Sequence, residues 1–345
     1  MVNTGEERGN RKLDHLRLFR QCYKACNSLE DIHLVHQALP EVDWKDIDLS
    51  CRWLGKSLAA PFIINAITGG PPETKKINAA LARAARETGI ALAVGSQRAA
   101  IENKAWADSF YIARQENPDG IILANLGAGN TLEAAREAVA MLAADGLQVH
   151  LNAAQELAMP EGDRSFRGWL DNIRVMSANL EVPVIAKEVG FGISRETAQQ
   201  LVAAGVRIID VGGCGGTDFV AIENKRRGKP LEVLQDWGLT TAVSLIEVKS
   251  LAEPPELVAT GGINSALDAA KALALGAKIV GAAGHFLNIL LERGEKALIA
   301  EIQAWQEDLR RILLLTGCIT PAELSHRPVV ITGKTREWLQ GIKRR

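Results

Sequence analysis

The sequence predicts an α/β protein folded as a single (β/α)8 TIM barrel. From residue 60 onward, short runs rich in Val, Ile, Leu and Ala alternate with longer segments of helical periodicity. The runs lack polar alternation, which is typical of strands buried on both faces of a parallel sheet covered by helices. Eight such strand-then-helix units in series favour a closed barrel over an open sheet.

The eight predicted strands are short, and small or polar residues follow each of them. They are PFIINAI from Pro61, IALAVG from Ile90, GIILANL from Gly120, LQVHLN from Leu147, VPVIAK from Val182, RIIDVGG from Arg207, ELVATGG from Glu256 and KIVGAAG from Lys278.

The stretches between the runs carry helix-end signals. TKKINAALARAARETG ends in a glycine suited to a C-cap, and SRETAQQLVAAG opens with Ser194, a good N-cap residue. NSALDAAKALALGA precedes the last strand in the same way. These signals support a helix after each strand.

The chain is predicted to be one domain over residues 1–345. Residues 1–59 form an N-terminal extension, helical around LRLFRQCYKACNSLEDIHLV, and residues 60–290 form the barrel. Residues 291–345 supply C-terminal helices and a tail. There EKALIAEIQAWQEDLRRILLLTG is expected to close the barrel, and the basic GIKRR to be solvated.

Composition narrows the class of protein. The formal net charge is −1 with 23% charged residues, so neither a nucleic-acid surface nor a membrane held by electrostatics is expected. Any anionic ligand must therefore be held by a local site. The apolar stretches are too short to span a membrane. Five scattered cysteines argue against a disulfide framework and favour a reducing cytoplasm.

In such a barrel the active site is built from the loops that follow the strands. ATGGIN and VGAAGHF bring glycine backbone N–H groups to the ends of the seventh and eighth strands, where barrels often hold a phosphate. Thr217, after the sixth strand, can add a hydroxyl. The strand ends predict a ligand site with a phosphate near units seven and eight.

Lys187 is the cation expected at the end of the fifth strand. A lysine there can simply neutralise Glu188 or cap the rim of the strand. Alternatively, it supplies a cation beside the pyrimidine side of a flavin, where it stabilises negative charge on the reduced ring.

Nine motifs occur in an order that resembles one family. They are RKLDH, ITGG, SQR, ANLGA, HLNAAQE, AKEVGFG, GGCGGT, DWGLTT and ATGGI. Together they resemble the type 2 isopentenyl-diphosphate isomerases from about residue 8 to about residue 290. HLNAAQE combined with the N-terminal RK pair is the most specific part.

The resemblance implies an FMN- and Mg2+-dependent enzyme of isoprenoid biosynthesis that interconverts isopentenyl and dimethylallyl diphosphate. The double bond moves without net redox change, so NAD(P)H is needed only to prime the flavin. The resemblance also implies a cytoplasmic homo-oligomer, a tetramer or octamer.

The resemblance assigns residues to three ligands. FMN is expected to bind Ala66, Ile67, Thr68, Ser96, Asn125, Lys187, Thr217, Gly261, Gly262, Ile263, Ala282 and Ala283. The substrate, mainly through its diphosphate, is expected to contact Arg11, Lys12, His15, Ser96, Arg98, His150, Asn152 and Gln155. Glu156 is expected to bind Mg2+.

These assignments agree with the chemistry of the ligand. A diphosphate carries roughly three negative charges, which Arg side chains and a carboxylate-held cation commonly balance. Because Arg11 and Lys12 precede the barrel, we expect the N-terminal segment to fold over the substrate as a lid; the alternative is a solvated basic segment.

The proton transfer implicates three catalytic candidates. A proton must be added at one end of the allylic unit and removed at the other, and the N5 region of reduced FMN is the leading candidate for this role. Gln155 is too weak an acid to act alone and is expected to orient the alkene or a proton carrier. Glu156 as a base is an alternative to its metal role, and Lys187 supports the flavin.

The loop after the sixth strand departs from the expected pattern. Gly212 stands where a serine is expected, which removes one hydroxyl contact to the flavin. Cys214 in the same loop invites comparison with the nucleophilic cysteine of inosine-monophosphate dehydrogenase. No nearby cation or base is assigned to it, so a structural role is expected.

Two other functions stay open at this point. The first is an FMN oxidoreductase of the 2-hydroxy-acid oxidase or inosine-monophosphate-dehydrogenase type. An oxidase would need a histidine base and paired arginines late in the barrel, where His285 is followed by no arginine until Arg293. The second is a non-catalytic flavin- or phosphate-binding barrel, against which the polar rim with Gln155 beside Glu156 argues.

Overall fold

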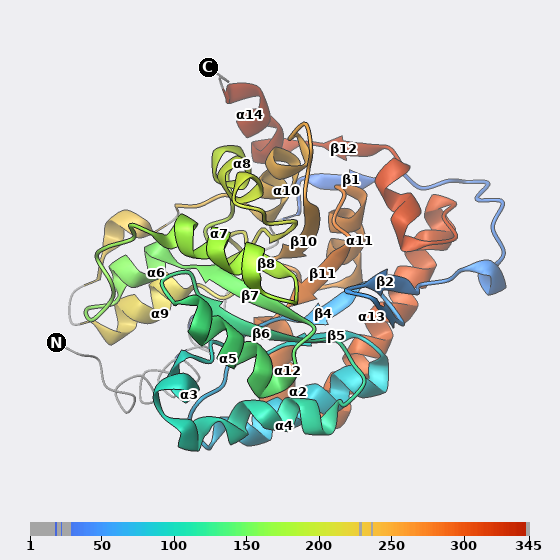
Figure 1. Ribbon diagram of the computed structural model, residues 1–345. Coiled ribbons are helices and arrows are strands. Elements are labelled where there is room, and N and C mark those ends of the chain that lie inside the picture. Colours follow the sequence, from blue (N-terminus) through green and yellow to red (C-terminus); the bar gives the residue numbers. More distant parts are fainter. Residues whose placement is uncertain (1–17, 19–21, 23–28, 228–229, 236, 343–345) are drawn as a thin grey trace.

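The computed structural model describes residues 18, 22, 29–227, 230–235 and 237–342. Eight parallel strands close into a barrel, and the predicted fold is confirmed (Figure 1). In chain order the barrel strands are β4 (Phe62–Ile64), β5 (Ala91–Ala93), β6 (Ile122–Gly127), β7 (Gly146–Leu151), β8 (Val184–Glu188), β9 (Ile208–Asp210), β10 (Glu256–Thr260) and β11 (Ile279–Ala282). Each strand overlaps one of the eight predicted runs, and β6, β7 and β8 each extend one residue beyond theirs.

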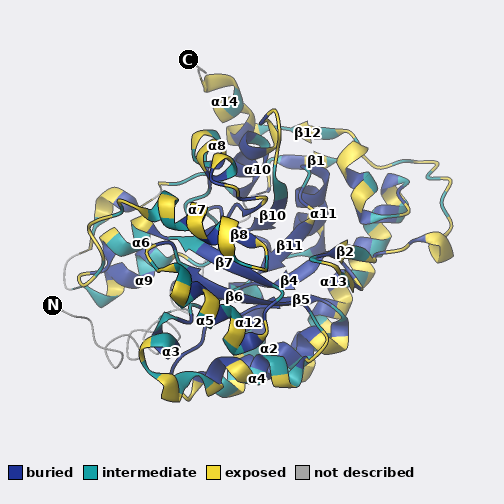
Figure 2. Ribbon diagram, in the orientation of Figure 1, coloured by how far each residue is buried: buried dark blue, intermediate teal, exposed yellow. Residues whose placement is uncertain are grey.

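Helices surround the strands and leave their outer faces in solvent (Figure 2). They are α2 (Thr74–Thr88), α3 (Arg98–Glu102), α4 (Asp108–Glu116), α5 (Leu132–Leu142), α6 (Ala153–Ala158), α7 (Trp169–Asn179), α8 (Arg195–Ala203), α9 (Phe219–Arg226), α10 (Thr241–Lys249), α11 (Ala266–Ala274), α12 (Gly284–Arg293), α13 (Glu295–Thr316) and α14 (Gly333–Gly341). Short 3-10 turns lie at Trp44–Asp46, Lys104–Trp106, Glu232–Leu234 and Pro321–His326. Across the part of the chain that the structure describes, no helix combines the length and apolarity needed to cross a membrane.

The helix ends follow the predicted signals. Gly89 ends α2 in the left-handed conformation, with φ 67°, and Ser194 accepts a hydrogen bond from the backbone N–H of Thr197 at the start of α8. Ser265 caps α11 in the same way. The predicted closing helix is α13, which packs against α2, α11 and α12.

The apolar side chains of the strands divide between two cores. Alternate residues such as Ile64 and Leu92 point outward and pack with the surrounding helices. Their neighbours, including Ile63 and Ile185, fill the barrel interior. Burial on both faces is why the runs lack polar alternation.

A hairpin closes the amino end of the barrel. Its strands are β2 (Cys51–Trp53) and β3 (Lys56–Leu58), which pair antiparallel. Trp53 packs with the interior apolar residues, and its indole N–H donates to the carboxylate of Glu256, the first residue of β10, at 2.6 Å. The opening of the barrel is therefore at the carboxyl ends of the strands.

A two-stranded sheet joins the N-terminal extension to the end of the chain. Strand β1 (Ile32–Leu34) pairs antiparallel with β12 (Val329–Ile331) (Figure 1). The helical prediction was wrong for this end of LRLFRQCYKACNSLEDIHLV, because Ile32 is buried against a partner almost 300 residues later. Most of that predicted helix lies outside the described residues.

Candidate active site

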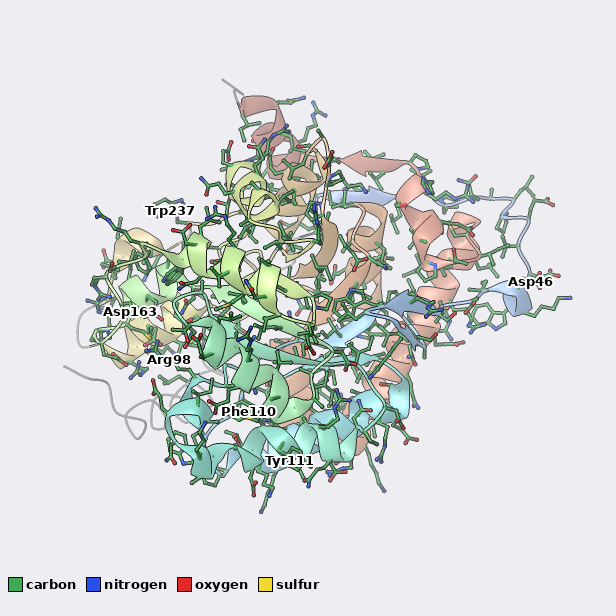
Figure 3. The ribbon with its side chains drawn as sticks, viewed as in Figure 1. Asp46, Arg98, Phe110, Tyr111, Asp163 and Trp237 are labelled. Atoms are coloured by element: carbon green, nitrogen blue, oxygen red, sulfur yellow. The ribbon has the colours of Figure 1, made fainter. Side chains whose placement is uncertain are left out.

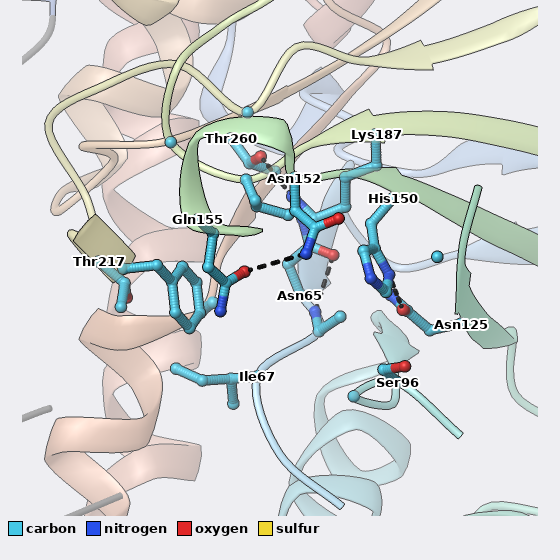
Figure 4. A pocket seen from close by; sticks show the side chains of 18 of the residues that line it. Asn65, Ile67, Ser96, Asn125, His150, Asn152, Gln155, Lys187, Thr217 and Thr260 are labelled. Atoms are coloured by element: carbon cyan, nitrogen blue, oxygen red, sulfur yellow. Dashed lines mark hydrogen bonds between the residues drawn. The ribbon is translucent and has the colours of Figure 1, made fainter. Parts of the chain in front are cut away.

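A cavity of about 680 Å³ opens at the carboxyl ends of the strands, where the site was expected (Figure 4). Most of the predicted site residues line it. They are Ala66, Ile67, Ser96, Arg98, Asn125, His150, Asn152, Gln155, Glu156, Lys187, Thr217, Gly261, Gly262, Ile263, Ala282 and Ala283. Thr68 lies behind this lining, whereas Arg11, Lys12 and His15 fall outside the described residues.

One wall of the cavity consists of glycines whose backbones nearly touch. A Cβ at Gly261, where φ is +100°, would lie 2.0 Å from the carbonyl oxygen of Gly213. A Cβ at Gly216 would lie 3.0 Å from the amide nitrogen of Gly262. Only glycine permits this close approach, which leaves backbone atoms accessible to a ligand.

The same wall contains the start of a helix. Ala283 and Gly284 line the cavity, and α12 begins at Gly284 without a side-chain cap. The first N–H groups of a helix have no partner within the helix, and its dipole favours an anion there. This end of the cavity therefore suits a phosphate.

Two buried hydroxyls near this wall have no hydrogen-bond partner within the described chain. They belong to Thr68 and Thr217. Buried polar groups are nearly always satisfied, so each unsatisfied hydroxyl calls for an explanation. Both residues are among the predicted FMN contacts; Thr217 lines the cavity, whereas Thr68 does not.

Polar side chains from β7 and α6 form the facing wall. His150 is the second-last residue of β7, and its Nδ1 lies 2.8 Å from Oδ1 of Asn125. Asn152 donates to Glu156 Oε1 at 2.9 Å and lies 3.4 Å from Gln155 Oε1 (Figure 4). The two residues that follow HLNAA, Gln155 and Glu156, thus lie together at the cavity.

Charged side chains surround the mouth. Arg98, about two-fifths exposed, pairs with Glu102 at 3.1 Å on the same short helix. Glu161 and Asp163 also line the cavity, and the backbone N–H of Asp163 donates to Glu156 Oε2 at 2.8 Å. Figure 3 labels Arg98 and Asp163 on the same side of the molecule. The mouth of the cavity therefore carries both a cation and several carboxylates.

Lys187 pairs with Asp210 and not with the carboxylate of Glu188. Its Nζ lies 3.3 Å from Asp210 Oδ2 and 2.9 Å from the backbone carbonyl oxygen of Glu188. Both charged side chains of the pair are buried. Lys187 therefore makes its ion pair with Asp210, although its charge also acts to lower the pKa of the Glu188 carboxyl.

Glu188 stabilises the loop that follows β8. Burial raises the pKa of its carboxyl to about 7, although the backbone N–H of Phe191 donates to it at 2.5 Å and favours the ionised form. The backbone N–H of Gly192 donates to the same oxygen. Glu188 thereby fixes the loop that carries the cavity residues Val189 and Gly190.

Gly212 is required by its surroundings. Its φ is +48°, and a Cβ there would lie 1.9 Å from the carbonyl oxygen of Glu188. Its own carbonyl accepts hydrogen bonds from the N–H groups of Gly190 and Gly192. The serine expected at this position could not adopt this backbone, so the loop after β9 presents main-chain atoms to the cavity instead.

Cys214 is not among the residues that line the cavity. Its backbone N–H donates to the carbonyl of Leu239, and it forms an isolated bridge with Thr240. This geometry supports a structural role.

The histidine that an oxidase would need is held by another side chain. His285 Nε2 lies 2.9 Å from a carboxylate oxygen of Glu301 on α13, and its ring lies against Trp305. His285 is among the residues that line the cavity, but its Nε2 is engaged by Glu301, which ties the imidazole to α13.

Several lining residues were missed. Asn65 and Thr260 lie at strand ends, and Asp210 and Gln148 lie behind them. The apolar side chains Met159, Trp169 and Phe219 also line the cavity. A polar residue within an otherwise apolar strand was the signal that could have identified Asn65, Gln148 and Asp210.

Comparisons with known proteins agree with this geometry. The model of the FMN-dependent dehydrogenase family matches residues 124–331. A chimera of (S)-mandelate dehydrogenase superposes with a TM-score of 0.64 at 19% identity, covering 94% of this chain and 98% of that one. A mandelate oxidase gives 0.62 at 17% identity, covering 88% and 90%. At such identities the likeness shows the fold alone.

The family model covers more than half of the chain, which therefore belongs to the FMN-dependent dehydrogenase family. A Moorella thermoacetica protein described as isopentenyl-diphosphate delta-isomerase is 72% identical over 98% of this chain and 97% of its own length. A Bacillus licheniformis protein with the same description is 47% identical over 96% of each. Within its family, the chain belongs to the isopentenyl-diphosphate delta-isomerases of the FMN-dependent type 2.

Proposed function

We infer that the protein converts isopentenyl diphosphate to dimethylallyl diphosphate, a step in isoprenoid biosynthesis, and we propose that it does so in the cavity at the carboxyl ends of the strands. The observation that carries the proposal is the division of this cavity into two walls. Glycine backbones and a helix start form one wall, and polar side chains from β7 and α6 form the other. A flavin phosphate suits the first wall, and a diphosphate suits the second.

FMN would bind along the glycine wall. Gly261, Gly262 and the start of α12 would hold its phosphate, and the hydroxyls of Thr68 and Thr217 would gain the partners they lack. Lys187 would lie by the isoalloxazine ring with Asp210 behind it. When reduced, the flavin supplies an electron-rich ring that can exchange a proton and stabilise positive charge.

The remaining predicted FMN contacts fit the same placement. They are Ala66, Ile67, Ser96, Asn125, Ile263, Ala282 and Ala283.

The substrate diphosphate would bind between Arg98 and His150. Arg98 can exchange its exposed pairing with Glu102 for a charge-assisted hydrogen bond to phosphate, and Asn152 can add an amide donor. Ser96 lies on the same side of the cavity. The apolar side chains of Met159 and Trp169 would then exclude water around the isoprenyl chain.

We propose that the N-terminal segment completes this site as a lid. Arg11, Lys12 and His15 carry the cationic and imidazole groups that a diphosphate needs, and they precede the barrel in sequence. Closure by such a segment would remove water from the reacting alkene.

Glu156 would bind Mg2+ together with phosphate oxygens. Its carboxylate uses one lone pair toward Asn152 and one toward Asp163 N–H, so acceptor positions stay available. Mg2+ typically uses one or two carboxylates plus substrate phosphates and waters, which fits a site with Glu156 as the protein ligand.

The chain provides two groups beside the alkene. Gln155 would orient the alkene or a proton carrier, since an amide is too weak an acid to deliver the proton. Glu156 is the alternative base. NAD(P)H would act only to prime the flavin, and a homo-oligomer, tetramer or octamer, is the proposed assembly.

One assay tests the proposal against its rivals. The purified protein with FMN, Mg2+ and a reductant is incubated with isopentenyl diphosphate, and dimethylallyl diphosphate is measured, with matched samples lacking FMN or containing excess EDTA. Product only in the complete mixture supports the proposal. An oxidised product would indicate an oxidoreductase, and the absence of any product would leave a binding protein.

A further inference from the structure

A chain of hydrogen-bonded side chains crosses the barrel interior behind the cavity. Asn65 Nδ2 donates to Asp210 Oδ2 at 2.7 Å, and Gln148 Nε2 donates to Asn65 Oδ1 at 2.8 Å. Asn125 Nδ2 donates to Gln148 Oε1 at 3.0 Å, and Asn125 Oδ1 lies 2.8 Å from His150 Nδ1. Each member lies on a different barrel strand or just after it, except Gln148 and His150, which share β7.

Asp210 sets the direction of this chain. Its carboxylate also receives the hydroxyl of Thr260 at 2.5 Å and lies 3.3 Å from Lys187 Nζ. An ionised carboxylate can only accept hydrogen bonds. Asn65 must therefore turn its NH2 group toward Asp210 and its oxygen away from it.

The backbone supports the same orientation independently. The N–H of Ala66 donates to Asn65 Oδ1 at 2.8 Å, which requires an oxygen on that side of the amide. Gln148 must then turn its NH2 group toward Asn65, and its oxygen accepts from Asn125. The oxygen of Asn125 is left to face the imidazole of His150.

We propose that Asp210, through Asn65, Gln148 and Asn125, holds His150 in the tautomer that is protonated on Nδ1. An oxygen facing Nδ1 requires a proton on that nitrogen. Nε2 is then the nitrogen that faces the ligand, and it lies toward Gly127, which lines the cavity. Asp210, Asn65 and Gln148 are positioning residues that act through His150.

The consequence concerns the diphosphate and rests on the proposed function. A ring whose Nδ1–H is anchored to a fixed oxygen cannot rotate, and a proton gained by the ring must reside on Nε2. That proton would be directed at a phosphate oxygen. The amide chain therefore pre-orients the imidazole before the ligand arrives, which reduces the ordering needed on binding.

The tautomer can be read directly. We suggest recording 15N NMR of the FMN-loaded protein labelled at its histidine rings, with the His150 signals identified by a His150→Gln variant. The expected result for neutral His150 is a protonated-type signal at Nδ1 and an unprotonated-type signal at Nε2. The opposite pattern in the wild-type protein would overturn the inference, and the His150→Gln variant serves only to assign the signals.

Gln148→Met interrupts the series of hydrogen bonds between Asp210 and His150 while leaving Lys187 and Asp210 in place. Asn125 then loses the acceptor that fixes its orientation, so His150 should populate both tautomers, and the Kd for inorganic pyrophosphate with Mg2+ should rise about tenfold, in line with one weakened hydrogen bond to a charged group. A single Nδ1-protonated form in this variant would contradict the inference.

Asn78→Leu is the matched control. Asn78 is a buried amide on α2 that donates to the carbonyl of Ser109 at 2.7 Å. In the described structure it makes no hydrogen bond to the side chains that link Asp210 to His150. Its loss should change stability but neither the tautomer nor pyrophosphate binding. Because the NMR result does not depend on turnover, an inactive protein with the expected tautomer would refute the proposed function alone.

Discussion

Lys187 is the residue on which the flavin side of the site depends most. Lys187→Met should leave FMN bound through the glycine wall but lower kcat at least 100-fold, as expected when one preorganised charge is removed. It also leaves Asp210 as a buried carboxylate without its cation, which costs about 3 kcal/mol. The measurements are the flavin absorption spectrum on reduction, the turnover rate and urea unfolding.

Lys187→Met/Asp210→Asn is the control for that loss of stability. If it restores stability, the loss in the single variant came from the unpaired Asp210 carboxylate. Turnover is compared only for the single variant, because Asp210 also orients Asn65. An unchanged reduced-flavin spectrum and turnover in the single variant would contradict the assigned role.

Glu188 predicts a pH dependence of stability. Burial raises the pKa of its carboxyl from 4.5 to about 7, so between these values the folded state holds a proton that the unfolded state releases. Stability therefore falls as pH rises through this window, by about 3 kcal/mol in total. Glu188→Gln lacks this titration while keeping an acceptor for Phe191 N–H.

The measurement is the free energy of unfolding in urea of both proteins at about pH 5 and about pH 8. The free energy of unfolding of the variant, relative to that of the wild type, should be greater at the higher pH. The same difference in free energy of unfolding between the two proteins at both pH values would contradict the raised pKa.

The sequence predicted most of the individual residues that line the cavity but not the polar residues inside the barrel. Asn65, Gln148 and Asp210 each interrupt an apolar run, which marks them as unusual but does not indicate which partners they contact. Their role depends on hydrogen bonds between strands far apart in the sequence. Such contacts follow from the closed barrel and cannot be read from one strand.

At the scale of elements, the loops after β8 and β9 depend on each other. Gly212 accepts from Gly190 and Gly192, and a side chain at Gly212 would meet the carbonyl of Glu188. Gly212→Ala should therefore cost about 3 kcal/mol and weaken FMN binding, because the loop must shift.

Gly55→Ala separates the cost of a positive φ from the cost of the contact with the Glu188 carbonyl. Gly55 also has a positive φ, +81°, but no atom lies within 4 Å of its added Cβ, so the cost should be about 1 kcal/mol. Thermal unfolding and FMN titration compare the two variants. Equal losses would show that the contact with Glu188 carries no energy.

Elements defined by local signals were predicted well, and those defined by distant partners were not. Capped helices such as α8 and α11 follow from their own residues. Strand β1 has no such signal, since Ile32–Leu34 becomes a strand only by pairing with Val329–Ile331. The β2–β3 hairpin that closes the barrel was missed for a similar reason, because Trp53 is buried by other strands.

At the scale of the whole molecule, the closed barrel follows from eight apolar runs that are each buried on both faces. Closure brings eight strand ends to one opening, while the hairpin fills the other end. A cavity of about 680 Å³ with a glycine wall and a polar wall is the result. The fold is shared with mandelate-oxidising enzymes, so the walls and not the barrel must determine the reaction.

In the proposed function, this cavity moves a double bond without consuming reductant. The most direct test counts dimethylallyl diphosphate formed against NADPH oxidised, by one protein sample under anaerobic conditions with FMN and Mg2+. We expect many product molecules for each NADPH, because the reductant only primes the flavin. One NADPH oxidised for each substrate converted would contradict it.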